Sequence, residues 1–357
     1  MRLQVKHTTY YRYSEPVSYS VNEVCLLPRA TTEQICESST LDISPTPDYL
    51  ETVVDVFGNL KTRFNIETPH IECRITAQST VSTLYRDADV ENQQRANAHN
   101  TDHARLASNL AATNRNHDLQ KSADSSIERD CLLPSHFVPH SNTLDCFVQE
   151  LERELNFNSP ATVVAADLTD YIYNNFTFDP NFSTVSTPLE AIVSSKRGVC
   201  QDFAHLAIAV LRCKNIPARY VSGYLETLPP PGQAKLRGAD ASHAWFSVYS
   251  SDSGWTDFDP TNNRKPGDGY ITTAWGRDYA DVAPLRGMVT GGGTHQLSVA
   301  VDVEPIAAVV ATTYDNNPLN NSSAANEAIH TAGRQSHHGL AESNLMRRQR
   351  KDKSCRH

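Results

Sequence analysis

One cysteine of this chain stands at the predicted start of a helix, and this placement limits the fold more than any other feature. The segment RGVCQDFAHLAIAVLR, residues 197–212, spaces its apolar side chains to form one helix face: Phe203, Leu206, Ala207, Val210 and Leu211. Gly198 precedes this helix and Pro217 follows it. A cysteine that only fills a core gap does not require such a position. The sequence therefore predicts an amphipathic helix that carries a thiol, Cys200, at its N-terminus.

Segments on both sides of this helix predict the class of the core. Two helices are expected before it, the second with Ser159 as N-cap, from apolar stripes at Leu144, Phe147, Val148, Leu151 and Leu155, then at Val164, Leu168 and Ile172. Strands are expected after it, in ARYVSGYL, HAWFSVYS, GWTDFDPT and THQLSVAVDVEP. We predict an α+β core over residues 131–310, in which the helix bearing the cysteine packs on an antiparallel sheet.

The first 80 residues predict β-structure. Strand-forming residues dominate three segments, LQVKHTTYYRY, ETVVDVFGNLKTRFNI and IECRITAQSTVST, and each is bounded by Pro, Gly, Asn or Asp. The FGN triplet inside the second segment predicts a hairpin turn. We expect a small antiparallel β domain over residues 1–80.

Two polar segments have no sustained periodicity. Residues 81–130 are rich in Asn, Asp, Ala, Gln, His and Ser, and are predicted to form a flexible linker or insertion. Residues 311–357 are predicted to form a disordered tail that ends in the basic run MRRQRKDK. This run is interpreted as a solvated terminus, and partner recruitment through it is the alternative.

Charge and cysteine usage restrict partners and location. The formal net charge of −9 argues against nucleic-acid binding, because phosphate neutralisation requires a surplus of Lys and Arg on one face. The N-terminus lacks the apolar run of a signal peptide, and no segment reaches membrane-spanning length. The eight cysteines have no regular spacing and are expected to be free thiols. A cytoplasmic protein without nucleic-acid or membrane partners is the resulting expectation.

The position of Cys200 suits a nucleophile. A helix N-terminus lowers the pKa of a thiol, and its backbone amides can stabilise an oxyanion. Such chemistry also needs a base and a carboxylate that orients the base. His243 begins a predicted strand, and Asp257 and Asp259 share one face of the next strand. Strand periodicity alone leaves the choice between the two aspartates open.

Three blocks, RGVCQDFAHLAIAVLR, SHAWFSVY and GWTDFDPTNN, together resemble the core of the transglutaminase-like superfamily of papain-like thiol enzymes. The segment HTTYYRYSEPVSYSVNEVCLLPR is similar to the β-rich N-terminal domain of its bacterial members, and residues 277–305 are similar to their closing segment. The resemblance implies a catalytic triad of Cys200, His243 and Asp259, the aspartate directly before Pro-Thr. It thereby favours Asp259 over Asp257.

The resemblance also implies an activity. The thiol would attack an amide or peptide carbonyl of a protein or peptide substrate, or a glutamine carboxamide, and form a thioester. The acyl group would pass to water, as in a protease or amidase, or to a second amine. No cofactor and no metal are expected. The alternative is a catalytically inert member of the superfamily that serves as a peptide-binding or interaction module.

Other reactive side chains have simpler interpretations. His205 is expected to pack or bond locally, and Asp202 to favour the helix dipole in the first turn. Cys146 and Cys213 are interpreted as packing or surface thiols, because neither has a histidine at metal-ligand spacing. The DFDPTNNRKPGDG segment lacks the spacing of a calcium-binding EF-hand loop.

Overall fold

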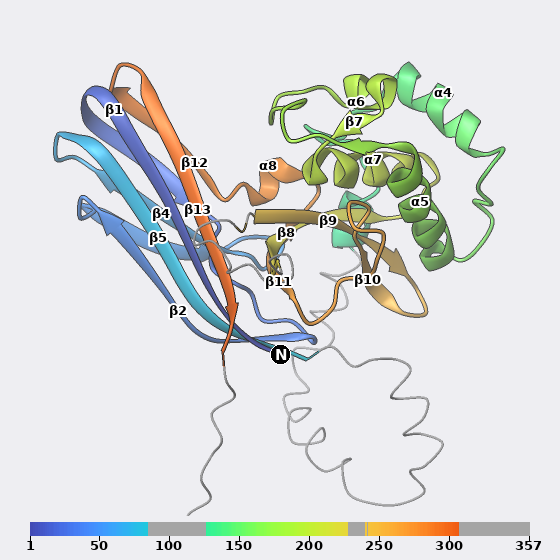
Figure 1. Cartoon of the computed structure of the whole chain (residues 1–357), viewed down its shortest axis with the longest axis horizontal. Helices are drawn as coiled ribbons and strands as arrows, with labels where there is room; N and C mark the ends of the chain where they lie inside the picture. The colour runs from blue at the N-terminus through green and yellow to red at the C-terminus, as the bar shows by residue number, and fades with distance from the viewer. Residues whose placement is uncertain (85–125, 228–239, 241, 307–357) are drawn as a thin grey trace, which may run out of the picture. The chain divides into compact units, whose positions relative to one another are not determined.

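The computed structural model describes residues 1–84, 126–227, 240 and 242–306 (Figure 1). Most of the predicted linker and the whole predicted tail lie outside the described residues. The described residues all fall in one compact unit. None of the described helices combines the length and the apolar character needed to cross a bilayer.

The N-terminal sheet is built around one long strand, β1 (Arg2–Val24). It has the order β2-β5-β1-β4-β3, and all neighbours are antiparallel. The partner strands are β2 (Gln34–Ser44), β3 (Tyr49–Val54), β4 (Leu60–Ile66) and β5 (His70–Thr83). The first half of β1 alternates as a one-sided strand should, with Leu3, Val5 and His7 buried. The predicted antiparallel β-structure is therefore present.

The predicted hairpin at FGN is confirmed. Strands β3 and β4 pair from Tyr49 with Asn65 to Val54 with Leu60. The chain turns between them through Gly58, whose φ of 77° lies in the region that favours glycine. The Asp55 side chain accepts hydrogen bonds from the backbone N–H groups of Phe57 and Asn59, both at 2.9 Å, and so holds the turn.

The last two strands join a different sheet from the one expected. Strands β12 (Leu285–Gly291) and β13 (His295–Pro305) fall in the range predicted for the core, but both pair with β1. The reason is the length of β1, whose other edge has room for two successive partners. The C-terminal end of the folded chain thus returns to complete the N-terminal sheet (Figure 1).

The second sheet carries the helices. It has the order β10-β9-β8-β11, with β8 (Ala218–Leu225), β9 (Ser242–Ser250), β10 (Gly254–Phe258) and β11 (Tyr270–Gly276). Helix α7 (Cys200–Cys213) packs against β9 and β8. Helices α4 (Asn142–Leu151), α5 (Ala161–Asn175) and α6 (Leu189–Ser195) pack against α7. This arrangement confirms the α+β core with the cysteine-bearing helix on an antiparallel sheet.

The predicted helix faces are buried. Helix α4 buries Leu144, Phe147, Val148 and Leu151, and the Ser141 side chain caps it by accepting from the Leu144 N–H at 3.3 Å. Helix α5 buries Val164, Leu168 and Ile172, but Pro160 rather than Ser159 is its N-cap. Helix α7 is buried on all sides from Asp202 to Arg212, because helices cover the face that the sheet leaves open.

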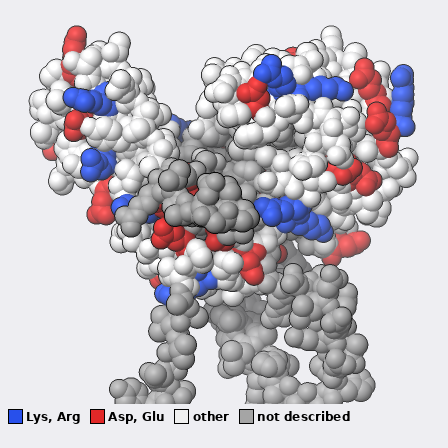
Figure 2. Space-filling view, viewed as in Figure 1, with Lys and Arg blue, Asp and Glu red and all other residues white. Residues whose placement is uncertain are grey.

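An apolar seam joins the two sheets. Leu3, Val5, Val81, Val301 and Val303 of the N-terminal sheet pack with Tyr224 of β8 and Ile271 of β11. Figure 2 shows basic and acidic side chains interspersed on one face of the molecule. No continuous basic stripe is visible on the described part of that face, in agreement with the net charge.

Candidate active site

Cys200 is the first residue of α7, and the turn before it is fixed by Asp202. The Val199 N–H donates to Asp202 Oδ2 at 2.8 Å, and the Ser183 hydroxyl donates to the same oxygen. A Cβ at Gly198 would lie 2.9 Å from Asp202 Oδ2, so this turn has no room for a side chain. Burial raises the pKa of Asp202, and this effect outweighs the two hydrogen bonds, which lower it. Asp202 therefore shapes the entry of the chain into the helix.

His243 and Asp259 are in direct contact. His243, near the start of β9, places Nε2 2.7 Å from Asp259 Oδ2. Asp259 is completely buried, and the His243 side chain is 11% exposed. An interaction with Cys200 also raises the pKa of this imidazole. The structure thus brings together the three residues that the sequence singled out, from the start of α7, from β9 and from the end of β10.

Asp259 is held by five hydrogen bonds. Oδ1 accepts from the backbone N–H groups of Thr261 at 2.9 Å and Asn262 at 3.3 Å. Oδ2 accepts from His243, from Asn262 Nδ2 and from the Tyr270 hydroxyl, each at 2.7 Å. Burial raises the pKa of this carboxyl, but the interactions with His243, Asn262 and Tyr270 outweigh burial and lower it. Asp259 is therefore a fixed carboxylate.

The surroundings favour a charged His243. Burial alone would lower the pKa of this imidazole, but hydrogen bonds and charge interactions with Asp259 and Cys200 raise it from 6.5 to about 10. The imidazolium is therefore stabilised by a carboxylate on one side and a thiol group on the other.

The second aspartate has a different partner. Asp257 Oδ2 accepts from the Trp245 indole N–H at 2.8 Å, and Trp245 is fully buried beside Tyr270. The two aspartates do share a face, as the strand periodicity indicated. Asp259, however, lies just beyond the end of β10, where a bridge to Arg264 turns the chain and aims the carboxylate at His243.

Two residues of the site were not found from the sequence. The Nδ2 atom of Asn262 lies 3.4 Å from His243 Nε2 and also donates to Asp259. Tyr270, the first residue of β11, donates to Asp259 and accepts from Arg264 Nε at 2.9 Å. The only signal for Asn262 was its place in the DPTNN block. Tyr270 had none, because its contact depends on the pairing of distant strands.

The remaining candidates behave as expected. His205 is buried, stacks on Phe137 with ring centroids 5.4 Å apart, and accepts from the Tyr279 N–H at 3.2 Å. Burial lowers its pKa to about 3, so it is neutral. The seven described cysteines are all free thiols.

One group of described side chains has the chemistry of metal ligands. His140, Asp145 and Cys213 place their ligand atoms within 4.8 Å of one another, which sequence spacing did not indicate because Cys213 comes from a different helix. His140 and Asp145 are largely exposed and already pair at 3.5 Å. The absence of a metal cofactor stays a prediction.

Comparisons with known proteins give the family. Residues 3–82 match the bacterial transglutaminase-like N-terminal region, and residues 149–260 match the transglutaminase-like superfamily. An uncharacterized protein of Mycobacterium tuberculosis is 36% identical over 315 residues, covering 85% of this chain and 93% of that protein. A protein-glutamine gamma-glutamyltransferase of Pseudomonas aeruginosa is 28% identical over 141 residues, covering 39% of this chain and 20% of that protein.

One solved structure agrees on the fold. A proposed cysteine protease from Cytophaga hutchinsonii has a TM-score of 0.60 and 21% sequence identity, and the match covers 86% of this chain and 91% of that chain. The resemblance inferred from the three sequence blocks is thus confirmed. This chain belongs to the transglutaminase-like superfamily and carries the N-terminal region of its bacterial members.

Proposed function

We propose that this protein is a thiol enzyme that attacks an amide or peptide carbonyl of a protein or peptide. One observation carries the proposal: Cys200, at a helix N-terminus, interacts with His243 and raises the pKa of this imidazole, which itself lies 2.7 Å from a buried carboxylate. Cys200 is the nucleophile, His243 the base and general acid, and Asp259 the group that fixes the imidazole.

The acylation step follows from the ring orientation. Because Nε2 of His243 faces Asp259, Nδ1 is the ring atom that takes the proton of the thiol. The thiolate attacks the carbonyl carbon, and the carbonyl oxygen becomes an oxyanion. The first intrahelical bond of α7 runs from the Phe203 N–H to the Val199 carbonyl, so the earlier N–H groups of Cys200 and Gln201 are available to stabilise that oxyanion.

The second half of the reaction releases the acyl group. Collapse of the tetrahedral intermediate forms a thioester at Cys200, and the imidazolium protonates the leaving amine or ammonia. Water or a second amine then attacks the thioester with His243 as base and restores the thiol. We favour water as the acceptor, hence a protease or amidase, with amine transfer as the other outcome.

The relatives support this class of reaction. The Pseudomonas protein carries the name of a glutamine acyltransferase, and the Cytophaga protein that of a proposed cysteine protease. Both reactions begin with a thiolate and a carboxamide or peptide carbonyl. A cytoplasmic location remains a prediction, which fractionation of the source cells would test.

The test uses peptides that contain glutamine and are incubated with the full chain, with and without a primary amine. Mass spectrometry of the peptides distinguishes chain cleavage, deamidation and amine incorporation. We expect one of these products with the wild type and none with Cys200→Ala, whereas the matched variant Cys146→Ala, an exposed thiol, retains full activity. Equal product from wild type and Cys200→Ala would refute the proposal, and an inert binding module would then be favoured.

A further inference from the structure

The second sheet ends at a strand whose outer edge is completed by side chains of the N-terminal sheet. Strand β11 pairs only with β8 among the described strands. An edge strand leaves a row of backbone N–H and C=O groups without strand partners. At two positions of β11, Thr272 and Trp275, side-chain amides take the place of the missing strand.

Gln34, the first residue of β2, makes the first pairing. Its Oε1 accepts from the Thr272 N–H and its Nε2 donates to the Thr272 carbonyl, both at 2.8 Å. Nε2 also donates to the Arg29 carbonyl at 2.7 Å, and the side chain is buried. One amide thus binds both backbone groups of one residue of β11, as a neighbouring strand would, and the Arg29 N–H also donates to the Thr272 carbonyl at 3.3 Å.

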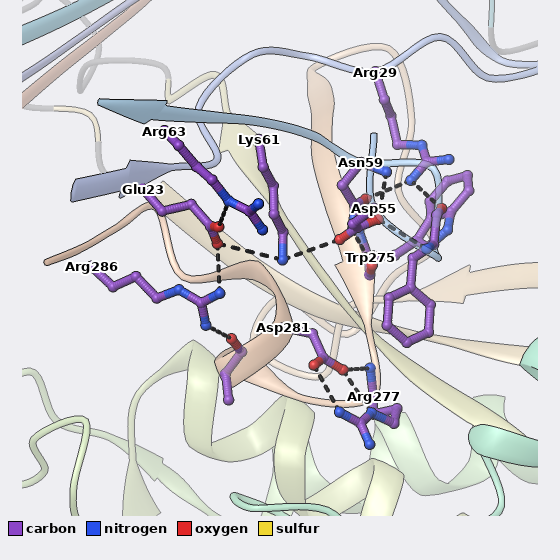
Figure 3. A network of polar contacts seen from close by, with 12 residues as sticks. Glu23, Arg29, Asp55, Asn59, Lys61, Arg63, Trp275, Arg277, Asp281 and Arg286 are labelled. Atoms are coloured by element: carbon purple, nitrogen blue, oxygen red, sulfur yellow. Dashed lines mark hydrogen bonds and ion pairs between the residues drawn. The ribbon is translucent and has the colours of Figure 1, made fainter. Parts of the chain in front are cut away.

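Asn59, in the turn between β3 and β4, makes the second pairing (Figure 3). Its Oδ1 accepts from the Trp275 N–H at 3.0 Å, and its Nδ2 donates to the Trp275 carbonyl at 2.8 Å. Asp55 accepts from the same Nδ2 at 3.0 Å. Arg29 donates to Oδ1 at 2.6 Å and stacks on the Trp275 ring, 3.2 Å from its centroid. Asn59 is completely buried and fixed from several directions.

A bulge in β11 makes both pairings possible. Outward-facing backbone groups recur at every second residue of a regular strand, but Thr272 and Trp275 are three residues apart. The register with β8 shifts between Thr272 and Ala274, which inserts one residue and reverses the alternation. Both residues therefore turn their backbone groups to the edge that the N-terminal sheet covers.

This edge connects directly to the candidate site. Thr272 is paired with Gly223 of β8, and Gly223 is paired with His243 of β9, so Gln34 and His243 lie at the two ends of one row across the sheet. Tyr270, two residues before Thr272, donates to Asp259. Strands β8 and β11 lie close together in this row, since a Cβ at Gly223 would lie 2.0 Å from the Ile271 carbonyl oxygen.

We infer that Gln34 and Asn59 are positioning residues for the Cys200–His243–Asp259 site, and that the N-terminal sheet sets the position of β11 and hence of Tyr270 and His243. This inference rests on the proposed function. It gives the N-terminal sheet a role in the reaction without any contact with the substrate. Shifts of about an ångström in a catalytic group are enough to cost on the order of 100-fold in rate.

The experiment replaces Gln34 by Met, which has similar length but no amide. Gln78→Met is the matched control, since Gln78 lies on β5 of the same sheet and is exposed. The readout is the rate of Cys200 alkylation across the pH range, which needs no substrate. For Gln34→Met we expect a loss of about 10-fold near neutral pH and a changed pH profile, consistent with a displaced site, whereas Gln78→Met matches the wild type.

A double-mutant cycle tests the route through Tyr270. If Gln34 acts by placing this tyrosine, the effects of Gln34→Met and Tyr270→Phe on the alkylation rate are less than multiplicative in the double variant. Multiplicative effects would overturn the route. A folded Gln34→Met protein with the wild-type rate and pH profile would overturn the inference as a whole.

Two controls keep the interpretation unambiguous. If Gln34→Met does not fold, Gln34→Asn, which keeps the amide on a shorter side chain, is measured instead, and a wild-type profile for it overturns the inference. If Cys200 of the wild type itself is unreactive, the proposed function fails. If the wild type is reactive and the Gln34 variants equal it, only the inference fails.

Discussion

Replacing Asp259 by Asn should move the proton of the neutral His243 imidazole from Nε2 to Nδ1. The Asp259 Oδ1 accepts from two backbone N–H groups, so the carbonyl oxygen of an asparagine would take that side. Its NH₂ group would then face His243 Nε2, Tyr270 and Asn262. An NH₂ group donates to Nε2, which leaves the imidazole proton on Nδ1, where it blocks transfer from Cys200.

The magnitude follows from the contacts. Interactions with Asp259 and Cys200 raise the pKa of His243 to about 10 against the effect of burial. One charge at hydrogen-bonding distance contributes about 1–3 pKa units, so the pKa in Asp259→Asn should fall to about 7–9. The wrong tautomer should lower kcat on the order of 10⁴-fold, as judged from the comparable change in serine proteases.

The assay is the pH profile of turnover. In the wild type, His243 loses its proton near pH 10 and activity should fall there; in Asp259→Asn, the fall should begin at a lower pH. Asp257→Asn is the matched control, since Asp257 binds Trp245, and it should change kcat by less than about 3-fold. If the two variants are equally active, the assignment of Asp259 is wrong.

Three predictions concern stability. Gly223→Ala should lower the free energy of unfolding by about 3 kcal/mol or more, because the new methyl group meets a backbone oxygen; a urea midpoint near that of the wild type would contradict the packing. Leu168→Ala should cost about 2–5 kcal/mol by the same measurement, whereas exposed Val163→Ala should cost less than about 0.5 kcal/mol. His205 binds a proton below pH 6.5 when unfolded, but only near pH 3 when folded, so acid favours unfolding. Urea unfolding at several pH values gives the slope at which the free energy of unfolding falls as the pH is lowered. This slope should be smaller in His205→Gln by about 1.4 kcal/mol per pH unit, and an unchanged slope would contradict a neutral His205.

Local patterns were sufficient for much of the fold. The apolar stripe ending at Leu211 located α7, and the FGN turn located the hairpin at Gly58, because both signals lie within a few residues of the structure they specify. Cys200 was found for the same reason, since its environment is the start of its own helix. His243 and Asp259 needed the family resemblance, because strand periodicity gives a face but no partner.

Contacts between distant segments could not be predicted in this way. Gln34 and Thr272 meet across more than two hundred residues, and no local pattern marks a glutamine that completes another sheet. Strand β13 was predicted as a strand and β12 was not, and only the length of β1 decides which sheet the two strands join. The preference of Asp257 for Trp245 likewise depends on side-chain geometry that periodicity does not contain.

The most direct test of a Cys200–His243–Asp259 site is the intact mass of the protein after limiting iodoacetamide at neutral pH. We predict one fast alkylation in the wild type that is absent in Cys200→Ala and slow in His243→Ala, because a nucleophilic thiol needs an adjacent base. Cys213→Ala, which changes the thiol at the other end of α7, should leave the fast alkylation intact. Slow labelling spread over several cysteines of the wild type would contradict an activated thiolate at Cys200.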